Sequence, residues 1–259
     1  MKSFFIRSIL CLAVAAFLLR NAAAQQTPTA DAPASQQTQP TDKTKSQNQE
    51  PKSTDKNQGT SNDRLFYALP NFLTLENTGK VPPLTVGQKF KVVTRGSFDY
   101  IQIPWYGMLA GISQAENSEP GYGQGAEGYG KRLGAYFADG TIENYMTGFV
   151  FPAVLHQDPR FFQESQGGFL HRTEYAVSRI FITRADSGHQ QFNYSEVFGS
   201  AVAAAISTYS YHPKGDRTLP NTASVWGTQV GYDTITIVIK EFWPDIRRKM
   251  SKKKQNASL

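Results

Sequence analysis

The chain has 259 residues and a formal net charge of +6, but this charge is unevenly distributed. Residues 63–244 carry 14 basic and 16 acidic side chains, whereas residues 245–259 carry six basic and one acidic. The basicity therefore belongs to the C-terminal tail, which argues against a nucleic-acid-binding face on the rest of the chain. The single cysteine, Cys11, lies near the start, so disulfides, thiolate metal sites and cysteine nucleophiles are excluded from the part that follows.

Residues 1–24 have the three parts of a secretory signal peptide. Lys2 and Arg7 give a positive start, Ser8–Leu19 is an apolar run, and three alanines end at Ala24. The run is shorter than the roughly 20 apolar residues needed to cross a bilayer. We expect cleavage after Ala24 and export to the periplasm or cell envelope; an uncleaved anchor is the alternative.

Residues 25–62 contain no Leu, Ile, Val, Phe, Tyr or Trp and are rich in Gln, Thr, Ser, Pro and Lys. Such a segment cannot bury enough apolar surface to offset the entropy of ordering it, so we expect a disordered linker. Residues 63–244 are long enough for one sizeable core.

The apolar spacing of residues 63–244 predicts an all-α fold, a single bundle-like domain of five to six helices. The expected helices cover residues 86–98, 104–115, about 127–155, 171–184, 194–209 and 222–242. Thr85 is the expected cap of the first, and Asn193 with Glu196 forms a capping-box-like pair at the fifth. Pro244 is expected to end or kink the last helix. Strand propensity is strong only at residues 234–239.

Three stretches lack charge: residues 100–115, 197–212 and 218–232. Ser, Thr, Gln, Asn and Tyr dilute their apolar content, so they are expected to be central helices of the bundle, with shallow membrane insertion as the alternative. Small residues recur every four positions at Gly130, Gly134 and Ala138, which favours close helix packing. The glycine-rich connection at residues 116–130 does not fit a phosphate-binding loop, because Arg132 stands where that motif needs Ser or Thr. We expect a tight turn there.

Histidine and carboxylate neighbours are the first candidates for chemistry. His156 lies two residues from Asp158, and Asp186 lies three residues from His189. No H-E-x-x-H motif occurs, and we predict neither a metal nor a cofactor. Three sequence-adjacent acid–arginine combinations are expected to form structural ion pairs; they are Asp158 with Arg160, Asp186 with Arg184, and Asp216 with Arg217.

The turn Ser187-Gly188-His189, together with Lys131-Arg132, resembles parts of the type 2 phosphatidic-acid phosphatase superfamily. In that family the Ser-Gly-His turn contacts phosphate, and an upstream Lys and Arg bind the phosphate oxygens. The resemblance implies the same roles for these residues here. Here Lys131 and Arg132 are adjacent, Asp186 replaces a usual proline, and no Ser-Arg precedes His212 where the nucleophilic histidine would be. A phosphate-ester hydrolase around Arg184 and His189 is therefore the alternative hypothesis.

The C-terminal tail suggests contact with an anionic membrane surface, because a basic cluster follows aromatic residues. The candidate contacts are Trp243, Arg247, Arg248, Lys249, Lys252, Lys253 and Lys254. A solvated tail with no partner is the alternative.

Four segments between residues 71 and 248 resemble an uncharacterised family of exported helical bacterial envelope proteins. They are Gly121–Arg132, His156–Arg160, Phe192–Ser195 and Glu241–Arg248. The resemblance implies an exported protein but no activity. The leading hypothesis is a non-catalytic protein docked on a membrane surface or another envelope component, with no nucleic acid partner and an undetermined oligomeric state.

Overall fold

The computed structural model of the chain describes residues 60–75 and 81–256. The signal peptide expected over residues 1–24 lies outside this range. So does the expected linker, except for its last three residues, and so does the side chain of Lys254.

The described part of the chain is mostly helical, with 66% of its residues in helices. The α-helices are α2 (Val86–Ser97), α3 (Gln102–Glu116), α4 (Gly125–Tyr145), α5 (Phe151–Val154), α6 (Phe169–Ser178), α7 (Ser200–Ser210) and α8 (Leu219–Asn256). Short 3-10 turns occur at η1 (Pro120–Tyr122) and η4 (Lys214–Asp216), and π-helical turns at η2 (Met146–Val150) and η3 (Ser195–Gly199). The prediction of a helical domain is confirmed at this level.

Three small sheets make the fold less purely helical than expected. Strand β1 (Arg64–Leu65) pairs antiparallel with β2 (Leu69–Pro70), and β3 (Thr74–Leu75) pairs in parallel with β5 (Phe161–Phe162). The third sheet has the order β4 (Gln157–Asp158), β6 (Ile182–Ala185) and β7 (Gln190–Phe192). The helix expected over residues 171–184 was wrong at its end, because α6 stops at Ser178 and the chain turns into a hairpin. Gly188, at φ +93°, permits that turn.

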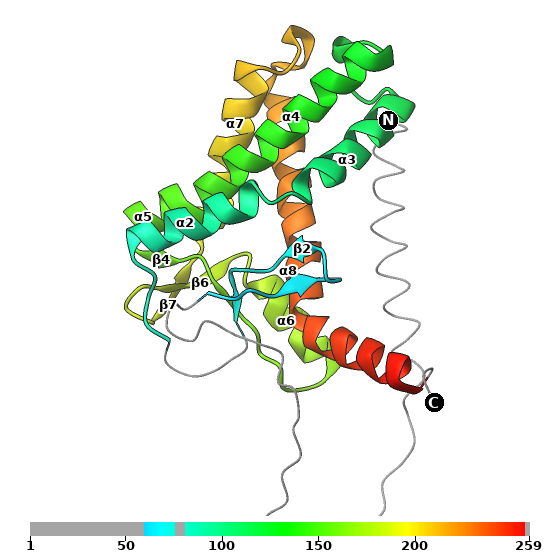
Figure 1. Cartoon of the computed structure of the whole chain (residues 1–259). Coiled ribbons are helices and arrows are strands. Elements are labelled where there is room, and N and C mark those ends of the chain that lie inside the picture. The colour runs from blue at the N-terminus through cyan, green and yellow to red at the C-terminus, as the bar shows by residue number, and fades with distance from the viewer. Residues whose placement is uncertain (1–59, 76–80, 257–259) are drawn as a thin grey trace, which may run out of the picture. The chain divides into compact units, whose positions relative to one another are not determined.

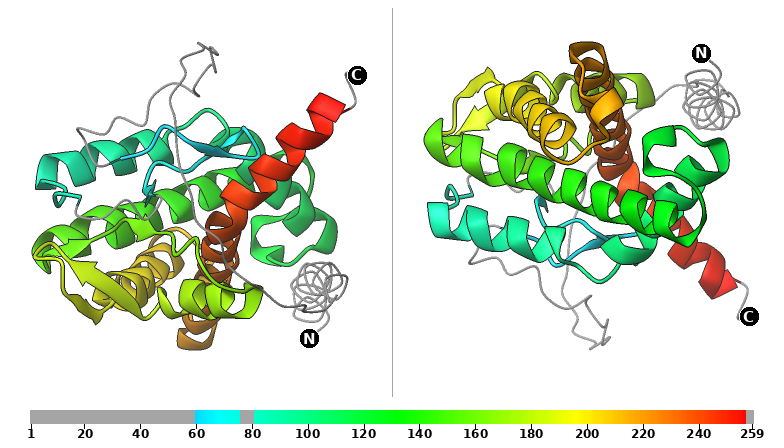
Figure 2. Two further views of the ribbon diagram at one scale, coloured as in Figure 1. Left: turned by 90° about the horizontal axis from the view of Figure 1, so that it is seen from below. Right: turned by 90° about the horizontal axis from the view of Figure 1, so that it is seen from above.

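The helices form one end of the domain, and the sheets form the other. Helix α4 lies between α3 and α7, and α7 also packs against α8 (Figure 1). The view from above shows the same order of helices (Figure 2). We call α3, α4, α7 and the part of α8 up to Lys240 the helical end, and the strands with α2 and α6 the base.

The base contains the apolar core. Phe72, Leu84, Val92 and Val93 form a fully buried cluster, with Tyr145 and Phe149 packed against it. Helix α2 is positioned by the expected cap: Thr85 Oγ1 accepts a hydrogen bond from the Gln88 amide, and Gln88 Oε1 accepts one from the Thr85 amide.

Helix α8 continues well beyond its expected end. It includes residues 234–239, so their strand propensity is overridden by packing against α6 and α7, and it passes through Pro244 to Asn256. Its last part runs in a different direction from its first, as expected when a proline interrupts the hydrogen-bond ladder (Figure 1). The basic segment is therefore the end of a helix as far as residue 256.

Buried ion pairs join the elements of the base. Lys89 Nζ, in α2, bonds both carboxylate oxygens of Asp186 at 2.9 and 2.8 Å, and also the carbonyls of Pro152 and Gln157. The guanidinium of Arg160 bonds both oxygens of Asp158. Both cations are almost fully buried. Loss of either carboxylate would leave a buried positive charge without a partner, so each ion pair holds its loop in place.

The side chain of Tyr106, in α3, packs directly against Gly140 of α4. A Cβ atom at this position would lie 2.0 Å from the hydroxyl oxygen of Tyr106, which is buried in the interface. Position 140 therefore has no room for a larger residue, because the Tyr106 side chain occupies the space that a Cβ atom would need.

We expect Gly140→Ala to lower the free energy of unfolding by about 1–3 kcal/mol through overpacking. Gly130→Ala, on the same helix where a Cβ would meet nothing within 4 Å, should instead be neutral or stabilising by up to about 1 kcal/mol. Tyr106→Phe should relieve part of the Gly140→Ala penalty in a double-mutant cycle measured by urea unfolding. Equal effects of the two alanine variants would contradict this interpretation.

Candidate functional site

The helical end has a polar interior. Its fully buried hydrophobic residues are only Tyr106, Ala110, Ala135, Ala203 and Ala204 among the residues described. Its fully buried polar residues are Ser113, Arg132, Ser200, Ser207, Thr208, Thr222 and Gln229. No Leu, Ile, Val, Phe or Met of this end is fully buried in the described structure. Soluble proteins usually show the opposite arrangement, with large aliphatic residues inside.

Three carboxyl groups meet in this interior: Glu143 of α4, Glu196 of η3 and Asp233 of α8. We call them the acid cluster. Glu143 and Glu196 each share a hydrogen bond with Asp233. Their side chains keep a little solvent contact, but Glu143 Oε1 and Glu196 Oε1 are buried and have no donor among the described residues. At least two of these carboxyls must therefore carry protons, because carboxylates cannot donate to each other.

Burial, followed by the charges of Asp233 and Asp139, raises the pKa of Glu143 well above its usual range. Burial and the charge and hydrogen bond of Asp233 do the same to the pKa of Glu196. For Asp233, burial also raises the pKa, although the bonds from Glu196 and Glu143 and the charge of Lys240 oppose it. The hydrogen bonds within the cluster thus oppose the effect of burial on the pKa of Asp233 and reinforce it on the pKa values of Glu143 and Glu196.

The two π-helical turns bring the cluster together. Turn η2 follows Glu143, and η3 contains Glu196; the two turns contact each other, since a Cβ on Gly199 would lie 3.3 Å from the backbone of Met146. Asn193 Oδ1 accepts a hydrogen bond from the Glu196 amide, as the capping pattern predicted. The Glu196 side chain, however, points into the cluster, so the second half of the expected capping box is absent. Such turns often occur at functional sites.

A second carboxylate site lies one turn along α4, at Asp139. The Tyr211 hydroxyl donates to Asp139 Oδ1 at 2.5 Å, and His212 Nε2 lies 3.3 Å from both carboxylate oxygens. Burial lowers the pKa of His212, but the hydrogen bond and charge of Asp139 outweigh burial, and the pKa is raised overall. His212 thus tends to carry a positive charge at the end of α7.

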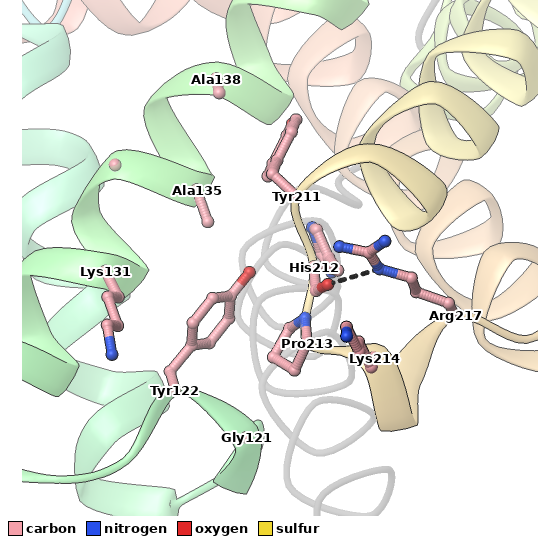
Figure 3. A pocket seen from close by; sticks show the side chains of 11 residues that line it. Gly121, Tyr122, Lys131, Ala135, Ala138, Tyr211, His212, Pro213, Lys214 and Arg217 are labelled. Atoms are coloured by element: carbon pink, nitrogen blue, oxygen red, sulfur yellow. Dashed lines mark hydrogen bonds between the residues drawn. The ribbon is translucent and has the colours of Figure 1, made fainter.

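A pocket of about 540 Å³ opens at the tip of the helical end, between α4 and the turns η1 and η4. We call it the tip pocket (Figure 3). Its lining is Gly121, Tyr122, Lys131, Gly134, Ala135, Ala138, Tyr211, His212, Pro213, Lys214 and Arg217. The predicted small-residue stripe at Gly134 and Ala138 therefore forms a pocket wall, where a close helix contact was expected. Of these residues, the sequence suggested only His212 and Lys131 as candidates for chemistry, because the pocket exists only when two turns distant in the chain meet.

The glycine-rich connection is a tight turn, held from within by Arg132. The Arg132 guanidinium is fully buried and donates to the carbonyls of Gly123 at 2.6 Å and Glu119 at 2.8 Å. Arg132 therefore holds the loop and does not face the tip pocket.

The candidates for chemistry, His156, Asp158, Arg184, Asp186, His189 and His212, are not brought together in one site. His189 is exposed on the β6–β7 turn and shares a hydrogen bond with Ser187 Oγ, while the Arg184 guanidinium stacks over the ring of Phe162. Asp158 pairs with Arg160 as predicted, whereas Asp186 pairs with Lys89 and not with Arg184. His156 follows α5, has a φ of +53° and is exposed. Its backbone carbonyl accepts a hydrogen bond from the Asp186 amide.

Two further expectations fail. Arg217 does not pair with Asp216; it donates to the carbonyls of His212 and Ser210. Lys131, in the first turns of α4, lies at the opposite end of the domain from the β6–β7 hairpin (Figure 1). The parts that resemble the phosphatase motifs are thus far from each other.

The tail residues divide into buried, paired and exposed groups. Trp243 is 1% exposed and packs edge-on against Phe66 and Tyr67, so its ring is not available to a membrane in this conformation. Arg247 pairs with Asp63, and Arg248 with Asp245. Lys249, Lys252 and Lys253 are exposed.

An apolar surface runs along the outer side of η3 and α7, from Tyr194 to Tyr209. Tyr194, Phe198, Val202, Ile206 and Tyr209 recur at three- to four-residue spacing and are 37–51% exposed. We call this surface the α7 flank. Residues 197–212, which include most of it, contain no Asp, Glu, Lys or Arg. Within the described residues, no helix combines the length and the apolar character needed to cross a membrane.

No family model, curated protein or solved structure matches this chain. The chemistry of the site must therefore be argued from its own residues. In the described part of the chain, no three His, Cys, Asp or Glu side chains are arranged to hold a metal ion.

Proposed function

We propose that this protein is an exported envelope protein that docks on an anionic lipid membrane through the α7 flank, with no catalytic role in that docking. The single observation that supports the proposal is the inverted distribution of residues in the helical end. Ionisable and hydroxyl groups are inside, while Phe198, Val202 and Ile206 face outward. This distribution resembles that of membrane-exposed helices, in which polar side chains face their neighbours.

Two helix faces are exposed and apolar, so the choice between them needs a second argument. The α3 face, formed by Ile103, Met108 and Ile112, lies between the acidic residues Asp99 and Glu116. The α7 flank is followed in the chain by Lys214 and Arg217, with Asp216 between them. Basic residues next to an apolar surface favour an anionic lipid surface, at about 1 kcal/mol for each one near it.

The remaining features of the proposal come from the sequence. Export rests on residues 1–24, and residues 25–62 would supply a tether of variable length. The exposed lysines at the end of α8 offer a second, electrostatic contact with the same membrane, because Lys249, Lys252 and Lys253 carry no paired acid in the described residues. Trp243 takes no part.

Flotation with anionic liposomes tests the docking surface. Replacing Phe198, Val202 and Ile206 by serine should weaken vesicle binding at least tenfold, because half-exposed apolar side chains together contribute about 2–3 kcal/mol on burial in lipid. The matched triple variant of Ile103, Met108 and Ile112 should bind normally. Removing residues 249–259 should weaken binding only at low salt.

Three results would reject the proposal. The first is that the wild-type chain does not float with anionic vesicles. The second is that the α3 variant loses binding while the α7 variant keeps it. The third is that the wild-type chain self-associates and the α7 variant does not. The last result would show that a second copy of the chain covers the α7 flank. Circular dichroism of each variant establishes that it is folded.

A further inference from the structure

We propose that the tip pocket binds a phosphate group, either on a small soluble molecule or on a lipid headgroup. This proposal does not depend on docking through the α7 flank. Its basis is the convergence of cationic and hydrogen-bond-donating side chains on one cavity, from segments that lie about 90 residues apart in the chain.

The charge of the pocket lining has one sign. Within the described structure, no acidic residue lines the pocket, whereas Lys131, Lys214 and Arg217 do, together with His212. Three acidic residues, Glu119, Asp139 and Asp216, lie close behind the wall and act on Tyr122 and His212. Asp139 is occupied by Tyr211 and His212. A group with two negative charges is the ligand that such a set of cations suits best.

The cations differ in how they are held. The Lys214 ammonium has no hydrogen bond or ion pair within residues 60–75 and 81–256, and Lys131 pairs with Glu127 only at the surface, where both are more than half exposed. Arg217 uses Nε and Nη2 on backbone carbonyls, which fixes the guanidinium in place and leaves Nη1 for a ligand. The lysines are thus mobile charges beside a fixed arginine.

Tyr122 provides the independent observation that points to a ligand. Its side chain is among the pocket lining, the residue is only 8% exposed, and its hydroxyl has no hydrogen-bond partner among the described residues. Figure 3 shows this hydroxyl pointing between Ala135 and the segment that carries His212. A buried hydroxyl without a partner costs about 1–3 kcal/mol. A phosphate oxygen would accept its hydrogen bond.

The opposite wall has no side-chain bulk. Gly134, Ala135 and Ala138 present only small groups from α4, and no atom lies within 4 Å of a Cβ placed on Gly134. A cavity of about 540 Å³ is larger than a phosphate ion, so the apolar wall and Pro213 leave space for the organic part of a phosphate ester.

Titration of the full chain with inorganic phosphate and with glycerol 3-phosphate, followed by calorimetry, tests this site. We expect saturable binding of both, with one site per chain. Lys214→Glu should weaken it at least tenfold, and Lys91→Glu, the same charge change at an exposed lysine of α2, should leave it unchanged. Tyr122→Phe keeps the ring and should weaken binding about five- to tenfold.

Flotation with vesicles that contain phosphatidate distinguishes the two sources of phosphate. If Lys214→Glu loses these vesicles but keeps vesicles of equal charge that contain phosphatidylserine in place of phosphatidate, the site takes a lipid headgroup. If it keeps both kinds of vesicle, or loses both equally, the phosphate that occupies the pocket is on a soluble molecule. The α7 triple serine variant should retain binding of inorganic phosphate, which separates this site from docking. Absence of saturable phosphate binding, or wild-type affinity in Lys214→Glu, would overturn the proposal.

Discussion

Glu241→Ala is expected to lower the free energy of unfolding by about 3–5 kcal/mol, the largest effect we expect from a single substitution. The carboxylate is fully buried and accepts hydrogen bonds from the Glu164 and Ser165 amides, both at 3.0 Å, and from Arg172 Nε at 2.8 Å. Its removal leaves Arg172 Nε and two backbone amides without their acceptor. Urea unfolding followed by far-UV circular dichroism measures the change.

Asp245→Ala is the matched control for this experiment. Asp245 also pairs with Arg172, at 2.6 Å, but its side chain is 32% exposed, so water can replace the lost contact. We expect a loss of about 1 kcal/mol. If Glu241→Ala costs no more than Asp245→Ala, then the connection between α8 and the 163–165 segment does not stabilise the base in the way described.

Stability is expected to fall as the pH rises from about 5 to 8, and the acid cluster is the cause. The pKa of Glu143 and that of Glu196 are raised in the folded state from the ordinary value of 4.5. Between 4.5 and the raised values, the folded chain holds protons that the unfolded chain has released. The contribution of the cluster is therefore complete below about pH 4.5 and is lost as the pH rises.

Glu143→Gln and Glu196→Gln test this directly, because the amide resembles a protonated carboxyl in shape. Each variant should flatten the pH profile and be more stable than wild type at pH 8, by about 1.4 kcal/mol for each pH unit between 4.5 and the raised pKa or pH 8, whichever is lower. At pH 5 the difference should be small. Asp139, Lys240 and Tyr106 also face the cluster and stay in place in both variants.

Glu174→Gln, on the exposed face of α6, serves as the control and should leave the profile unchanged. Chemical denaturation at pH 5, 6.5 and 8 provides the measurement. Parallel profiles for wild type and Glu143→Gln would show that the three carboxyls are not coupled in the folded protein.

The same cluster explains why the helical end differs from an ordinary bundle. Glu143, Glu196 and Asp233 lie near Lys240, whose own pKa is lowered by burial despite the charges of Asp233 and Glu196. Such groups are stable in an interior only when they share protons or charges. Small and hydroxyl-bearing residues surround these groups in the interior. The large apolar residues of the helical end therefore lie on its surface, where some of them form the α7 flank.

The amino-acid sequence by itself determined the helices that depend on local signals. Thr85 with Gln88 defines the start of α2, and the charge-free stretches at 100–115, 197–212 and 218–232 became α3, α7 with its preceding turn, and the first half of α8. These signals lie within a few residues of each other, so capping and apolar periodicity are sufficient to predict them.

The tertiary structure decided which groups meet. Strand β6 replaced the end of a predicted helix because its partners, β4 and β7, complete its hydrogen bonds. The tip pocket needed η1 and η4 to come together, and the acid cluster needed two π-helical turns and Asp233, far along the chain. Hydrophobic patterns report which residues avoid water, but not which distant side chains share a proton, because that depends on contacts formed only after the helices pack.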